Sequence, residues 1–162
     1  MIYQVVPPDQ LLTQGDILDG CPIVRATADG AVDLLRGQVV VLTQACDLAQ
    51  TKADLVVVAV VHPAARVVEQ GQLKGSAVRD QVRRGQVFGW YYLPAAPEPI
   101  ALPESIVNLR DLHTVPRELL EKLAADGKRV GRLLTPYREH LAQHFAVTYM
   151  RIALPEPYET HP

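Results

Sequence analysis

Two stretches rich in β-branched residues, residues 37–46 and residues 55–61, constrain the fold more than any other feature. Both are almost wholly apolar and lack the alternation that marks a strand with one face in water. Runs of this length and composition are typical of strands that are buried on both faces. We therefore predict that these two strands form the centre of a sheet.

Short elements are expected around this centre. Thirteen prolines divide the chain into short pieces, which favours short strands and loops over long helices. An Asp-Gly pair within residues 28–31 predicts a hairpin turn. Residues 86–93 and 105–110 predict further strands, whereas residues 64–85 fit no single element.

The final third changes to a helical pattern. Thr114 is expected to cap a first helix that ends at Gly127. The pair Thr135-Pro136 is expected to begin a second helix, over residues 137 to about 149. The predicted fold class is therefore α+β, with a small, strongly curved antiparallel sheet or a small barrel followed by two C-terminal helices.

Length and composition indicate one globular unit. A chain of 162 residues fits one domain, and we expect a single α+β domain over residues 1–154 and a flexible C-terminal tail over residues 155–162. Apolar residues make up 48% and charged residues 21%, which excludes a disordered chain. No run reaches the roughly 20 apolar residues of a membrane span, and no secretory signal is visible. We therefore expect a cytoplasmic protein with no membrane partner.

The charge distribution is uneven. The formal net charge of −2 argues against a strong, non-specific binder of polyanions, but basic residues outnumber acidic ones over residues 66–151. Basic residues near an aromatic run, Trp90-Tyr91-Tyr92, suit single-stranded nucleic acid, since phosphates pair with arginine and bases stack on rings. The predicted nucleic-acid-binding residues are Arg83, Arg84, Lys128, Arg129 and Arg132. The alternative is a solvated charged face over core aromatics.

The most conspicuous polar segment is Gln44-Ala45-Cys46-Asp47, where the first apolar strand ends. The caspase signature is excluded, because the turn that follows and an upstream histidine are lacking. A thiolate nucleophile at Cys46 would need a base, which His62 or His113 supplies if the fold brings it near. The alternative is that Cys46 is a buried structural cysteine and that Asp47 opens the loop.

Other polar residues give weaker indications of a functional site. His140 and His144 are spaced to share a metal on one helix face, but two ligands do not make a stable zinc site, and surface histidines are the alternative. Asp16 is a candidate for satisfying backbone donors, and Arg110 and Asp111 are candidates for a structural ion pair. No phosphate-binding loop, dinucleotide fingerprint or Gly-x-Ser-x-Gly motif is present, and no cofactor is predicted.

The order of the motifs resembles the MazF/PemK-type endoribonuclease toxins. The matching segments are Gly15-Asp16-Ile17, residues 36–43, the strand 55–61 that ends at His62-Pro63, and residues 105–115. The chain also resembles uncharacterised bacterial proteins with a Ser/Thr-Gln-x-Cys-Asp motif at a strand end. The toxin resemblance implies an SH3-like barrel, commonly a homodimer, that cleaves RNA without a metal. In that chemistry the 2′-hydroxyl attacks the neighbouring phosphate with help from a general acid and base and a cation.

Within this resemblance, Arg36 and Thr43 match the arginine and the serine of a toxin strand. Gly37 replaces the proline that follows the arginine, and His62 stands where a catalytic threonine is expected. These departures favour a related fold whose toxin activity is lost or altered. We hypothesise a protein of a bacterial regulatory or defence module that binds single-stranded RNA or a protein partner.

Two alternatives remain open. One is a small hydrolase or metal-independent endoribonuclease, for which the candidate catalytic residues are Arg36, Thr43, Cys46, Asp47, His62 and His113. The other is a pure interaction module that docks through an edge of the barrel or through the helices of residues 114–149.

Overall fold

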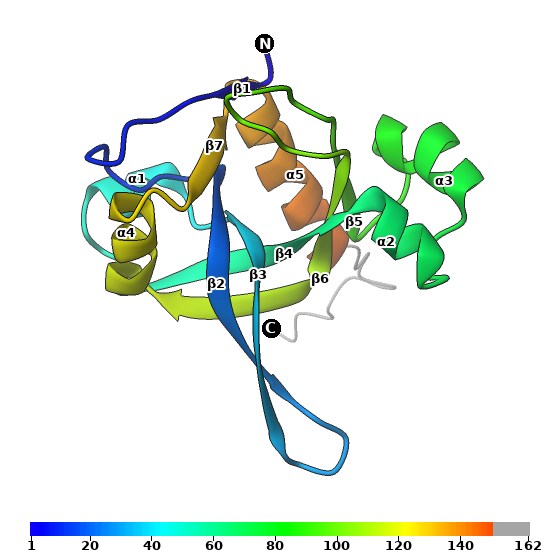
Figure 1. Ribbon diagram of the computed structural model, residues 1–162, viewed down its shortest axis with the longest axis horizontal. Helices are drawn as coiled ribbons and strands as arrows, with labels where there is room; N and C mark the ends of the chain where they lie inside the picture. The colour runs from blue at the N-terminus through cyan, green and yellow to red at the C-terminus, as the bar shows by residue number, and fades with distance from the viewer. Residues whose placement is uncertain (151–162) are drawn as a thin grey trace, which may run out of the picture.

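A seven-stranded antiparallel sheet organises the protein, with strand order β1-β7-β2-β3-β4-β6-β5 (Figure 1). The computed structural model describes residues 1–150, so the tail predicted over residues 155–162 lies outside the described residues. The strands are β1 (Tyr3–Gln4), β2 (Asp16–Ala26), β3 (Val32–Val41), β4 (Leu55–Pro63), β5 (Trp90–Leu93), β6 (Ser105–Pro116) and β7 (Arg129–Leu133). The α+β class and the antiparallel sheet are confirmed. The sheet is open, with β1 and β5 at its two ends, and does not close into a barrel.

Five helices and one 3-10 turn surround the sheet. They are α1 (Ala45–Ala49), α2 (Ala64–Glu69), α3 (Gly75–Asp80), η1 (Val82–Arg84), α4 (Arg117–Ala125) and α5 (Tyr137–Tyr149). In Figure 1, α2 and α3 lie together at one end of the sheet, α1 and α4 lie at the other, and α5 crosses behind the strands. No helix of residues 1–150 is both long and apolar enough to cross a bilayer.

The two central strands are buried on both faces, as predicted. In β4, Val56, Val58 and Val60 point to one side and pack in a core that includes Leu120 of α4. The alternate residues Ala59 and Val61 point to the other side, where the core includes Leu141 of α5. The period of two along a strand therefore explains why a continuous run of valine and alanine was selected here.

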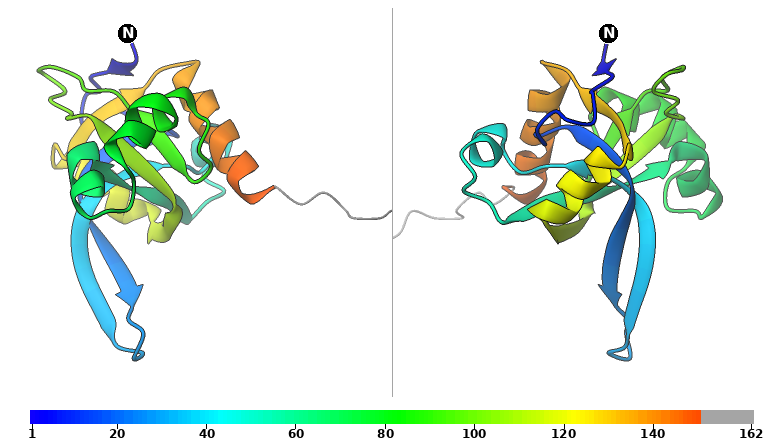
Figure 2. Two further views of the ribbon diagram at one scale, coloured as in Figure 1. Left: turned by 90° about the vertical axis from the view of Figure 1, so that its right-hand side faces the viewer. Right: turned by 60° about the vertical axis from the view of Figure 1, so that its left-hand side comes forward.

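The outer half of the β2–β3 hairpin projects from the body as a two-stranded arm, residues 22–36 (Figure 2). Pairing of β2 with β7 ends at Leu18, and pairing of β3 with β4 begins at Gln38, so neither strand of the arm has a second neighbour. The turn at residues 27–31 confirms the predicted hairpin, with the amide of Gly30 donating to the carbonyl of Thr27.

The last third differs from the prediction in one element. Helix α5 has the predicted bounds, but β7 lies between α4 and α5, so the chain does not end in two consecutive helices. The predicted cap at Thr114 is wrong, because β6 continues to Pro116 and α4 begins at Arg117. Pairing of β6 with β4 satisfies the backbone of Thr114 in the sheet, and this tertiary pairing overrides the local capping preference.

Candidate acid–base site

A bulge in β6 brings a cluster of titratable side chains together. The register between β4 and β6 shifts between Ala59 and Val60, whose partners are Leu112 and Asn108. Residues 109–111 of β6 are therefore left without partners in β4. Bulges bend a strand and redirect its side chains, and here the bulge presents Asp111 between two histidines.

Asp111 is the centre of this cluster. His113 lies two residues further along β6, and its Nε2 donates a hydrogen bond of 2.9 Å to Oδ1 of Asp111. The other oxygen, Oδ2, forms an ion pair with Arg25 of the arm and lies 3.9 Å from Nε2 of His62 on β4. We call these four residues, Arg25, His62, Asp111 and His113, the Asp111 cluster. Their side chains retain between 14% and 38% of their exposure, so a solute can reach them.

The electrostatics of the cluster keep one imidazole neutral. Burial lowers the pKa of His62 below its ordinary value of about 6.5. The negative charge of Asp111 opposes this effect, whereas the positive charges of Arg25 and Arg66 add to it. At neutral pH His62 is therefore an unprotonated imidazole beside two guanidinium groups, which is the state that a general base requires.

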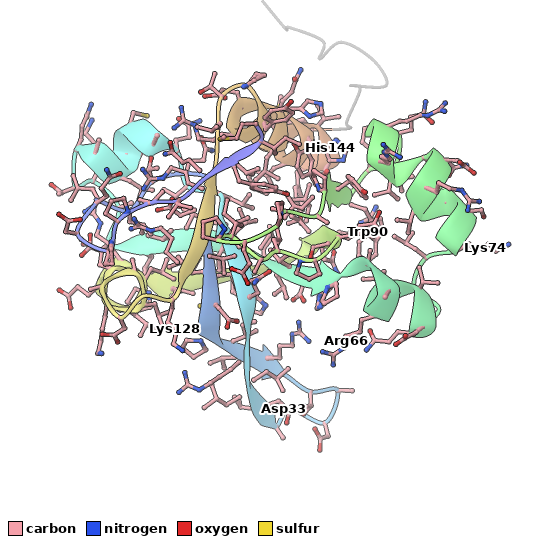
Figure 3. The ribbon with its side chains drawn as sticks, turned by 45° about the horizontal axis from the view of Figure 1, so that its top comes forward. Asp33, Arg66, Lys74, Trp90, Lys128 and His144 are labelled. Atoms are coloured by element: carbon pink, nitrogen blue, oxygen red, sulfur yellow. The ribbon has the colours of Figure 1, made fainter. Side chains whose placement is uncertain are left out.

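His113 also borders a pocket of about 440 Å³. One wall is the base of the arm, with Pro22 and Val24, and the other is residues 112–116 of β6 together with Leu119 of α4. The cluster is thus open to a pocket on one side. On the other side is α2, from which Arg66 projects on the side of the sheet where the arm emerges (Figure 3).

The structure brings two of the predicted catalytic residues together, His62 and His113, and places the other four elsewhere. The hydroxyl of Thr43 accepts a 2.8 Å hydrogen bond from the amide of Val57, which joins the end of β3 to β4. Arg36 is exposed on the arm and donates to the carbonyl of Gly20 at 3.2 Å. Neither residue contacts the Asp111 cluster.

Cys46 lies in α1 and is exposed, so the alternative of a buried structural cysteine is wrong. Its Sγ lies 3.6 Å from Oε1 of Gln44 and 3.9 Å from Oδ1 of Asp47, both within the same turn. Among the described residues neither histidine contacts it. The thiol therefore lacks the imidazole base that a cysteine nucleophile needs. The buried thiol of the chain is Cys21, whose pKa burial raises to about 11.

The predicted basic residues fall into two separate groups. Arg83 and Arg84 are exposed on η1, which follows α3, while Lys128 is exposed between α4 and β7. Helices α3 and α4 lie at opposite ends of the molecule (Figure 1). Arg129 and Arg132 of β7 have side-chain exposures of only 2% and 12%. The single basic face that the clusters suggested is therefore not assembled.

Arg129 and Arg132 instead surround a buried carboxylate. Asp16 has no exposed surface, and its Oδ1 accepts a 2.5 Å hydrogen bond from Nε of Arg132, with Nε of Arg129 3.4 Å from Oδ2. Asp16 also accepts from the amide of Thr13, as its candidate role implied. The two arginines donate in turn to backbone carbonyls of the N-terminal segment, those of Pro7, Gln10 and Leu11.

The two histidines of α5 have different surroundings. His140 is exposed, with its Nδ1 3.4 Å from the hydroxyl of Tyr91. His144 is buried, against the alternative of a surface histidine, and its Nε2 lies 3.2 Å from the carbonyl oxygen of Val87. Within residues 1–150 no group of three or more His, Cys, Asp or Glu side chains is arranged to hold a metal ion.

Sequence reasoning did not identify Arg25 or Arg66 and assigned Asp111 the wrong partner. Asp111 pairs with Arg25 rather than with its neighbour Arg110. Arg25 lies 86 positions away in the chain, so no local pattern could have indicated the pair. The one local signal was the Asp-x-His spacing of Asp111 and His113 in a strand, which places both side chains on one face when no bulge intervenes between them.

Comparisons with known proteins add no name to this geometry. No family model matches the chain, and a search of curated proteins finds no significant match.

Proposed function

We propose that the Asp111 cluster is the active site of a metal-independent endoribonuclease that cleaves single-stranded RNA. The observation that supports this most is the convergence of two imidazoles and an arginine on one carboxylate at an exposed bulge. RNA cleavage by its own 2′-hydroxyl needs a base, an acid and a positive charge near the phosphate. The cluster contains all three kinds of group.

The proposed roles follow from the environment of each side chain. Neutral His62 takes the proton from the 2′-hydroxyl as its oxygen attacks phosphorus. Asp111 accepts a hydrogen bond from Nε2 of His113, and when this ring is in its doubly protonated imidazolium form, Nδ1 gives its proton to the departing 5′-oxygen and the ring becomes neutral. Arg25 and Arg66 stabilise the charge that develops on the phosphoryl oxygens. The bond from phosphorus to the 5′-oxygen breaks, and the products are a 2′,3′-cyclic phosphate and a 5′-hydroxyl.

The MazF/PemK resemblance is the second support, since it implies metal-independent RNA cleavage. His62 departs from the catalytic threonine of the toxins, and in this proposal it supplies the base in a different way. The same proposal includes three further points. The open sheet is related to the SH3-like barrel, the protein forms a homodimer, and it acts in a bacterial defence or regulatory module. Cys46 and Asp47 have no role in it, because they lie in a different turn.

The test is cleavage of a long single-stranded RNA by the purified protein in EDTA. We expect His62→Gln to reduce the cleavage rate by about 10²–10⁴-fold, the usual contribution of a general base. Arg25→Gln is expected to reduce it as well. His140→Gln is the matched control, since His140 is an exposed histidine on α5, and it should cleave at the original rate. Arg36→Ala tests whether Arg36, which matches the arginine of a toxin strand in the MazF/PemK resemblance, contributes to cleavage.

A substrate without free 2′-hydroxyl groups provides a second test. RNA with a 2′-O-methyl group at every position should remain intact, because the attacking hydroxyl is blocked. Intact ordinary RNA, with the protein shown to be folded, would contradict the proposal and favour the alternative of a protein-interaction module. Cleavage that His62→Gln leaves unchanged would place the activity elsewhere.

A further inference from the structure

Trp90 shares the sheet face of the Asp111 cluster. In the register of the sheet, Trp90 of β5 pairs with Asn108 of β6, and Asn108 pairs with Val60 of β4, two positions before His62. Directly paired residues point to the same side of a sheet, and so do residues two apart in one strand. Trp90 and His62 therefore lie on one face, two strands apart, or about 10 Å across the sheet.

The indole ring of Trp90 is partly covered and partly open. It packs against a small core beneath α2, α3 and η1, which includes Val67, Val82 and Ile106. Trp90 as a whole is half-buried. A half-buried aromatic ring that rests on a core offers a rigid surface on which nucleic-acid bases stack. Figure 3 shows Trp90 above Arg66, close to the middle of the molecule.

A cation lies next to the backbone that precedes this ring. Gly89, which precedes Trp90, has a φ of +84°, and a Cβ placed on it would lie 2.6 Å from Nη1 of Arg110. The exposed Arg110 side chain therefore rests directly against the backbone of Gly89, in space that only a glycine leaves free. The bulge that presents Asp111 thus also places Arg110 against Gly89, the residue before Trp90.

We infer that Trp90 is the base-stacking residue of the proposed RNA site and that Arg110 binds the phosphate of the stacked nucleotide. The inference rests on the proposed function, because it takes single-stranded RNA as the substrate of the Asp111 cluster. It extends the site from the reacting groups to a neighbouring nucleotide, held on the same face of the sheet.

Trp90 is the single tryptophan of the chain, which gives a direct test. A fully 2′-O-methylated RNA oligonucleotide, which cannot be cleaved, is titrated into the whole protein while tryptophan fluorescence is measured. We expect saturable quenching that parallels binding measured by anisotropy of a labelled oligonucleotide. Binding without any change in fluorescence would overturn the inference.

Variants of Trp90 distinguish a role in stacking on RNA bases from a role in stabilising the fold. Trp90→Leu keeps an apolar cover over the small core but removes the ring, and we expect binding to weaken by about 5–150-fold, the range for loss of one stacked base. Trp90→Tyr should recover most of the affinity. Arg110→Gln should lower the slope of affinity against salt by about one phosphate contact. Tyr137→Leu, which removes an exposed ring at the start of α5, is the control and should bind normally.

The outcomes distinguish this inference from the proposed function. Quenching and the expected variant effects without cleavage of ordinary RNA would support the stacking site while contradicting the nuclease. Cleavage of ordinary RNA with a KM that Trp90→Leu leaves unchanged would support the nuclease and overturn the stacking site. Absence of both binding and cleavage in a folded protein would overturn both.

Discussion

Replacing Asp16 by asparagine tests the account of how the N-terminal segment is held. Asp16 has no exposed surface, and the side chains of Arg129 and Arg132, the two cations beside it, are 2% and 12% exposed. An asparagine side chain would fill the same space without the charge, and two nearly buried guanidinium groups would lose their counterion. Breaking one partner of a buried ion pair costs about 3–5 kcal/mol, against a total stability of about 5–15 kcal/mol.

The expected result is a large fall in the free energy of unfolding. For a domain of this size, about 3–5 kcal/mol corresponds to a Tm lower by roughly 6–20 °C. Urea denaturation followed by circular dichroism measures the free energy, and hydrogen exchange at the amide of Thr13, which donates to Asp16, reports loosening of the N-terminal segment. Asp9→Asn, an exposed change in the same segment, is the control and should fall within about 0.5 kcal/mol of the original protein.

A double variant makes the test more specific. Since Asp16 and Arg132 are in direct contact, the cost of Asp16→Asn with Arg132→Met should be smaller than the sum of the two single costs. A loss below about 1 kcal/mol for Asp16→Asn, or strictly additive costs, would refute the reasoning that this carboxylate balances two buried cations.

Two further predictions concern the titratable groups. Asp111→Asn should lower the pKa of His62 further and Arg25→Gln should raise it, because these residues are the opposing charges beside it. NMR titration of the imidazole checks both, and shifts of the same sign would contradict the assignment. Cys46 should react quickly with an alkylating reagent in the folded protein, whereas Cys21 should react only after unfolding, as peptide mass spectrometry would reveal. Equal rates would contradict the difference in burial.

Several elements could be predicted because their determinants are local. The run 55–61 predicts a strand buried on both faces, and the structure places its side chains alternately in two cores. The start of α5 was predicted from the pair Thr135-Pro136, and the helix runs over Tyr137–Tyr149 as expected. Strand β7 was not predicted, because its polar residues Arg129 and Arg132 look solvent-facing in a sequence. Both face Asp16, more than 110 positions earlier, which makes a polar strand compatible with burial.

The candidate site shows the same division. His62 and His113 stood out in the sequence as histidines at a strand end and near a strand end, and both belong to the Asp111 cluster. Cys46 stood out as strongly, yet its turn leaves it exposed and away from any histidine of the described residues. The chemical type of each residue can be read from the sequence. The distances between side chains on different strands, on which catalysis depends, cannot.

Local patterns in the chain were enough to predict the two central strands and the last helix, since burial follows the period of apolar side chains along a single element. Which polar groups meet depends instead on contacts between elements that are far apart in the chain. One shift of register in β6 turns Asp111 toward His62 and toward Arg25, and a register is set by the packing of the whole sheet rather than by any one strand.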